Sequence, residues 1–169
     1  METQELLGII ANGEDSKHQF KATINNVNSI ASEMAAFSNS RGGHILIGVN
    51  DDGSISGLSS ESLRDINQTI ANAATNNVKP AINPITQNFA LPDGMVMLLT
   101  IESGLNKPYM DSSGYIWVKS GSDKRRVTAR EELQRMFQEA ALVHADETPV
   151  RGSSVADIDQ EFFDSFFEK

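Results

Sequence analysis

The chain has 169 residues, contains no cysteine and carries a formal net charge of −9 at pH 7. That length suits one domain with a short extension, and the lack of cysteine excludes disulfides, thiolate zinc sites and cysteine nucleophiles. The acidic amino terminus is not a signal peptide, and no apolar run approaches the ~20 residues of a membrane-spanning helix. We therefore expect a cytoplasmic protein with no membrane partner.

The negative charge is concentrated near the carboxyl end. Residues 141–169 hold seven acidic and two basic residues and so carry −5, which leaves only −4 for residues 1–140. Five cations of that larger part fall within twelve positions: Lys119, Lys124, Arg125, Arg126 and Arg130. Because phosphate binding depends on the cations at the contact surface, the total charge does not exclude a nucleic-acid partner.

The first elements follow from hydrophobic spacing. Apolar residues at 6, 9 and 10 predict a short helix that ends near residues 12–13, and alternation predicts a half-exposed strand over 18–21. A longer helix, capped by Asn26 or Asn28, ends before a Gly-Gly pair. Residues 44–50 then predict a central strand that is apolar on both faces.

The second half of the chain continues with hairpins and two helices. An Asp-Gly turn at 50–53 predicts a short returning strand, and residues 60–73 predict a helix. A hairpin is expected over 85–102, and a further strand over 115–119. Thr128 is expected to cap the last helix, with an acidic residue three positions later as a capping box.

The periodic pattern ends near residue 143. We expect residues 1–143 to form the domain, and residues 144–169 to form a linker and the start of a following domain. The linker is indicated by a proline and a Gly-Ser-Ser sequence, and four phenylalanines on an acidic segment follow it. The alternative is a terminal helix that packs on the domain.

The helix end at residues 38–43 is the most informative local pattern. Gly42 and Gly43 can expose backbone N–H groups to a phosphate. The simpler interpretation is a helix end followed by a strand, which glycine favours without any ligand. No Gly-Lys-Ser or Gly-Lys-Thr follows, so the segment is not a Walker loop.

Three segments, in order, resemble the Schlafen/AlbA-like domain. Residues 36–58 read AFSNSRGGHILIGVNDDGSISGL, which is similar to the family's helix end, strand and turn. Phe20-Lys21 matches an upstream Glu-Phe-Lys motif, and residues 107–128 read KPYMDSSGYIWVKSGSDKRRVT, similar to the family's closing motif. The resemblance covers about residues 14–137. It implies an α+β fold with a mixed, mostly antiparallel sheet and helices packed on it.

The resemblance also implies a function. Family members include DNA-binding modules of transcriptional regulators and RecG-related helicases, often ahead of an ATPase-like or winged-helix segment, and some are metal-dependent ribonucleases. The ribonuclease carboxylates correspond here to Glu14, Gln19, and Asp51 or Asp52. Because the Gln19 amide brings no charge to a metal ion, we expect no catalysis, no metal and no cofactor in this segment. Turn chemistry alone also explains the two aspartates.

A nucleic acid, DNA in the first place, is the partner we expect. The cations expected to contact its phosphates are Lys17, Lys21, Arg41, Lys119, Lys124, Arg125 and Arg126, the last four around a Ser-Gly-Ser loop at 120–122. A solvated basic face is the alternative for these residues. The alternative function is a dimerisation module, which would make a homodimer, or a protein-interaction module.

Overall fold

The computed structural model describes residues 1–140 and Ser154. The predicted segment 144–169, and the boundary at 143, therefore lie outside the described residues except for Ser154. The elements, in chain order, are α1 (Thr3–Asn12), β1 (His18–Lys21), α2 (Val27–Asn39), β2 (Gly43–Ile47), α3 (Ser60–Asn72) with a π-helical extension (Ala73–Asn77), β3 (Val78–Lys79), β4 (Ile85–Leu91), β5 (Gly94–Ile101), β6 (Met110–Asp111), β7 (Trp117–Ser120), β8 (Asp123–Arg126) and α4 (Arg130–Glu139).

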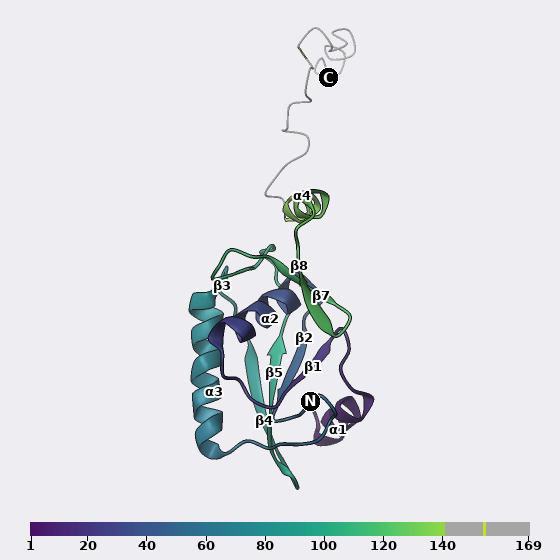
Figure 1. Cartoon of the computed structure of the whole chain (residues 1–169), viewed down its shortest axis with the longest axis vertical. Helices are drawn as coiled ribbons and strands as arrows, with labels where there is room; N and C mark the ends of the chain where they lie inside the picture. Colours follow the sequence, from purple (N-terminus) through teal and green to yellow (C-terminus); the bar gives the residue numbers. More distant parts are fainter. Residues whose placement is uncertain (141–153, 155–169) are drawn as a thin grey trace, which may run out of the picture.

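Four strands form the main sheet in the order β1-β2-β5-β4 (Figure 1). β1 runs parallel to β2, with His18 opposite His44, whereas β2–β5 and β5–β4 are antiparallel. Two further antiparallel pairs, β3–β6 and β7–β8, lie outside this sheet. The predicted α+β class with a mixed, mostly antiparallel sheet is confirmed.

Helices cover both faces of the sheet. Because side chains alternate along a strand, Ile45 and Ile47 of β2 belong to a core shared with α2 and α3, while Leu46 belongs to a second core with Leu6 of α1 and Phe20 of β1. Each of the longest helices, α2 and α3, has 13 residues. Every helix within residues 1–140 is too short or too polar to span a lipid bilayer.

The second helix, α2, has neighbours on two sides. The Asn26 side chain caps its amino end by accepting hydrogen bonds from the backbone of Asn28 and Ser29, as predicted. All residues from 30 to 39 are buried, because α2 has contacts with β5 of the sheet, with α3, with β3 and β6, and with the β7–β8 hairpin. A polar residue on this helix is therefore enclosed wherever it points.

Two glycines decide where α2 and β2 end. The N–H of Gly42, at φ +70°, donates to the Phe37 carbonyl at 3.0 Å, which ends the helix in the way glycine favours. Gly48, at φ +96°, ends β2 before the predicted residue 50. A Cβ at Gly48 would lie 2.8 Å from the Met95 carbonyl oxygen, so no larger residue fits there. The predicted returning strand is reduced to one bridge, Val49 to Ile55.

The chain after residue 120 differs from the prediction. Residues 123–126 form the strand β8, which has no apolar alternation and therefore gave no sequence signal. The predicted Thr128 cap is wrong: Ala129 is the N-cap, and its side chain makes no capping bond. The Val127 N–H is still paired with the Ile116 carbonyl, which keeps this segment extended until α4 begins.

Candidate nucleic-acid interface

Glu33 of α2 is a buried acid, 3% exposed, that faces β1 and the β7–β8 hairpin. Its Oε1 lies 2.5 Å from the Lys124 Nζ and 3.8 Å from the Lys21 Nζ. The Gln19 amide donates to the same oxygen at 3.3 Å. The other oxygen, Oε2, is buried and accepts no hydrogen bond within the described structure. Together with Lys119, these residues are called the Glu33 cluster below.

Lys119 completes the Glu33 cluster from strand β7. Its Nζ donates to the Gln19 side-chain oxygen at 3.2 Å and to the Ser122 carbonyl at 2.5 Å. The same ammonium lies 4.7 Å from the centre of the Phe37 ring, which suits a cation–π contact. Burial lowers the pKa of Lys119, and the nearby Glu33 carboxylate opposes that effect. A cation is thus held in a partly desolvated position.

Strand geometry explains why these side chains meet. Gln19 and Lys21 are two positions apart on β1 and share one face. Lys119 and Lys124 are directly opposite each other in the β7–β8 register, so they share one face of the hairpin. The Glu33 cluster contains three lysines and one carboxylate, which gives it a formal charge of +2 within a chain of −9.

The two arginines of β8 are also held by neighbours. Arg125 donates two hydrogen bonds, of 2.9 and 2.6 Å, to the carboxylate of Glu132 on α4, and these bonds lower the pKa of Glu132. The Arg126 guanidinium stacks 3.2 Å from the centre of the Tyr115 ring. Arg125 and Arg126 are thus exposed residues that each have a partner within the protein.

Lys17 and Arg41 lie apart from these contacts. Both side chains are exposed, and neither makes a hydrogen bond or ion pair with the residues that the structure describes. Lys17 precedes β1 and Arg41 precedes β2, so both mark the edge where these parallel strands begin. The rings of His18 and His44 stack at that edge, with centres 5.7 Å apart.

The positions of the family's carboxylates do not form a metal site here. Glu14 accepts a hydrogen bond from the Phe20 backbone at 2.7 Å, and Gln19 points into the Glu33 cluster. Asp51 is exposed on the turn, and Asp52 accepts hydrogen bonds from Ser54. Within the described ranges, no group of three histidine, cysteine or acidic residues could hold a metal ion.

Sequence reasoning did not single out Glu33. It is three residues after Ile30 and four before Phe37, both of which are buried. An acid at that spacing lies on the apolar face of the helix, and a buried charge requires partners. The spacing of Glu33 along the helix therefore indicates a buried acid. It does not identify the residues that contact this acid, which come from β1 and the β7–β8 hairpin.

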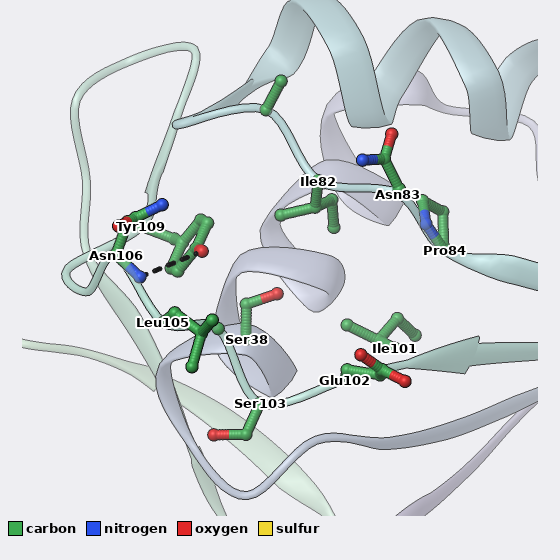
Figure 2. Close-up of a pocket in the computed structure, with 12 residues that line it drawn as sticks. Ser38, Ile82, Asn83, Pro84, Ile101, Glu102, Ser103, Leu105, Asn106 and Tyr109 are labelled. Carbon is green, nitrogen blue, oxygen red and sulfur yellow. Dashed lines mark hydrogen bonds between the residues drawn. The ribbon is translucent and has the colours of Figure 1, made fainter.

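A separate cavity of about 300 Å³ lies beside the carboxyl end of α2 (Figure 2). Ile82 and Ile101 form part of its wall, and the buried Ser38 hydroxyl, which has no hydrogen-bond partner in the described structure, points toward them. Its lining contains one charged residue, Glu102, and no lysine or arginine. An anionic phosphate would therefore not be favoured in this cavity. The Glu33 cluster is the better candidate for a phosphate-binding site.

Comparison with known proteins supports the family and the fold. The family model described as Schlafen, AlbA_2 matches residues 14–128, more than half of the chain. DIP2311 of Corynebacterium diphtheriae has a similar structure, with a TM-score of 0.55 at 19% identity over 78% of this chain and 31% of that protein's chain. The present chain thus spans about a third of that protein.

A second similar structure is the N-terminal domain of a Nitrosomonas europaea protein described as related to the ATP-dependent DNA helicase RecG. The TM-score is 0.51 at 19% identity, over 77% of this chain and 97% of that domain. No curated protein sequence matches the chain. At this identity, the two structures establish a shared fold.

Proposed function

We propose that this chain, which belongs to the Schlafen AlbA_2 family, is a nucleic-acid-binding module. It would hold the phosphate backbone without cleaving it. DNA is the nucleic acid we favour, since one similar domain comes from a protein named after a DNA helicase. We further propose that the module serves a transcriptional regulator or a helicase-like protein.

The observation that carries this proposal is the convergence of Lys21 and Lys124 on the Glu33 carboxylate, with Lys119 joined to them through the Gln19 amide. A local excess of positive charge attracts phosphates even on an acidic protein, because salt screens charges more than about 10 Å away. Lys17 and Arg41 add two exposed cations without partners in the described structure. Contacts of this kind position a nucleic acid without reading its sequence.

Binding without cleavage follows from the chemistry at residue 19. Magnesium-dependent hydrolysis needs several anionic oxygen ligands, whereas the Gln19 amide is neutral. Its oxygen accepts a hydrogen bond from Lys119 and its nitrogen donates to Glu33. Both ends of this amide thus have protein partners. We propose that the segment has no catalytic residue and takes no cofactor.

Fluorescence anisotropy tests the proposal with labelled duplex DNA, single-stranded DNA and structured RNA over a series of salt concentrations. Binding to duplex DNA should weaken with salt at a log–log slope of about −0.9 per phosphate contact. Replacing Lys17 and Arg41 with alanine should make the slope shallower by roughly two contacts, for unrelated sequences alike. The control is Arg64→Ala with Lys79→Ala, which removes two exposed cations elsewhere. No binding at about 50 mM salt would overturn the proposal.

Self-association is a second candidate, favoured by α4. This helix contains no buried residue, and Leu133, Met136 and Phe137 lie half-exposed at helical spacing. Figure 1 shows α4 beyond β8, away from the helices that cover the sheet. Sedimentation velocity should then show a dimer that Leu133→Ser with Phe137→Ser converts to a monomer. A monomer at all concentrations would exclude this candidate.

A further inference from the structure

We infer that Glu33 is an internal competitor for the phosphate: its carboxylate holds the lysines of the Glu33 cluster inward and thereby limits the affinity for nucleic acid. This inference rests on the proposed function, because it concerns the same lysines. It assigns to Glu33 the role of an affinity-limiting residue.

The donors of the Glu33 cluster are arranged around one anionic oxygen. The ammonium groups of Lys124 and Lys21 and the amide of Gln19 all face Oε1, at 2.5, 3.8 and 3.3 Å. Ammonium and amide donors converging on an anionic oxygen would equally suit a phosphate oxygen. The Glu33 carboxylate thus occupies the position that a phosphate oxygen could take.

The second carboxylate oxygen shows that the arrangement does not maximise stability. Oε2 of Glu33 is buried and has no hydrogen-bond partner in the described structure, and an unsatisfied buried acceptor lowers the stability of the fold. An apolar side chain of similar size would avoid that cost. The acid also leaves two of the three lysine charges without compensation inside the Glu33 cluster. Competition between Glu33 and a phosphate for the lysines would give the acid a function at this position.

The lysine side chains are more exposed than the carboxylate that they contact. The side chains of Lys21 and Lys124 are 23% and 21% exposed, and the side chain of Glu33 is 4% exposed on a helix that is buried on both sides. A lysine has a flexible four-carbon stem that can carry its ammonium group to the surface. We therefore expect a nucleic acid to draw the ammonium groups outward, against the attraction of Glu33.

Replacing Glu33 with glutamine tests the inference. The amide keeps the size of the side chain but removes the charge that holds the lysines, so binding to duplex DNA should tighten on the order of tenfold at low salt. The salt slope should become steeper by about one to two units as one or two more lysines reach phosphates. The matched control is Glu61→Gln, an equal charge change at an exposed position of α3, which should leave the slope unchanged.

A second variant tests the opposite direction. Gln19→Glu adds a carboxylate to the Glu33 cluster and should weaken binding and make the slope shallower, with EDTA present so that no metal contributes. Thermal unfolding checks that both variants are folded. If Glu33→Gln does not fold, unchanged binding by folded Gln19→Glu overturns the inference.

The outcomes separate this inference from the proposed function. Wild-type binding that Glu33→Gln does not tighten overturns the inference and leaves the function intact. Should no variant bind any nucleic acid, the function fails, and inorganic phosphate becomes the probe. If phosphate then raised the melting temperature of Glu33→Gln but not of the wild type, Glu33 would be supported as the occupant of an oxyanion site. If phosphate stabilised neither protein, the oxyanion site would be overturned as well.

Discussion

The Asn39 side chain and the Tyr109 backbone, 70 positions apart, exchange two hydrogen bonds of 2.7 Å each. The Asn39 amide also donates to the Trp117 carbonyl at 2.8 Å. One buried side chain therefore acts as a strand partner for two segments and fixes the β6–β7 region against the end of α2. That attachment places the β7–β8 hairpin, and with it two lysines of the Glu33 cluster.

Replacing Asn39 with alanine should lower the free energy of unfolding by about 2–4 kcal/mol, because buried backbone groups of Tyr109 and Trp117 lose their partners. Urea unfolding followed by circular dichroism measures the change. Asn88→Ala, on an exposed position of β4, should change stability by no more than about 0.5 kcal/mol. Equal effects of the two variants would contradict the role assigned to Asn39.

The pair formed by Lys124 and Glu33 predicts a large coupling energy. Lys124→Ala should destabilise the fold by about 2–4 kcal/mol, because it removes the closest partner of a buried carboxylate. In the Glu33→Gln background, the same change should cost much less, since no charge remains to be compensated. A double-mutant cycle from chemical denaturation gives the difference. Additive effects of the two changes would show that the ion pair contributes nothing to stability.

The two arginines of β8 should contribute unequally to nucleic-acid binding. Arg126→Ala should make the salt slope on duplex DNA shallower by about 0.9, because stacking on Tyr115 leaves the edge of the guanidinium free for a phosphate. Arg125→Ala should have a smaller effect, since Glu132 already takes two of its hydrogen bonds. Anisotropy titrations at several salt concentrations compare the salt slopes of the two variants. A larger change of slope in Arg125→Ala than in Arg126→Ala would contradict the prediction.

Acid should reduce stability through Asp15. Burial acts to raise the pKa of its carboxyl group, but hydrogen bonds from the Lys17 backbone and from His18 outweigh burial and lower it. The unfolded state then binds more protons, so this stabilisation is present above the ordinary value of 3.8 and is lost as the pH falls through the lower folded-state pKa. Asp15→Asn should therefore flatten the fall of the melting temperature below about pH 5.

Thermal unfolding followed by circular dichroism at several pH values measures the effect of Asp15. Ser16→Ala is the control, because it changes an exposed neutral neighbour and should leave the acid dependence as in the wild type. The same steepness in Asp15→Asn and wild type would show that this carboxyl does not contribute.

The sequence predicted those elements whose signals are local. The β4–β5 hairpin and the Asn26 cap follow from residues that are neighbours along the chain. The strand β8 was missed because it is stabilised by pairing with β7 and by contacts of its charged side chains, not by apolar alternation. The Glu33 cluster was missed for a related reason, since the Lys124 that faces Glu33 is 91 positions away.

The central position of β2 has a consequence for how the chain folds. Its neighbour β1 comes shortly before it, but its other neighbour, β5, begins only at Gly94. Pairings between segments so distant in sequence slow folding, because the intervening loop must close before the contacts form. During synthesis, the backbone N–H and C=O groups of β2 that pair with β5 would stay unpaired until β5 has left the ribosome. We therefore expect the domain to fold late, in one cooperative step, after most of its residues have emerged.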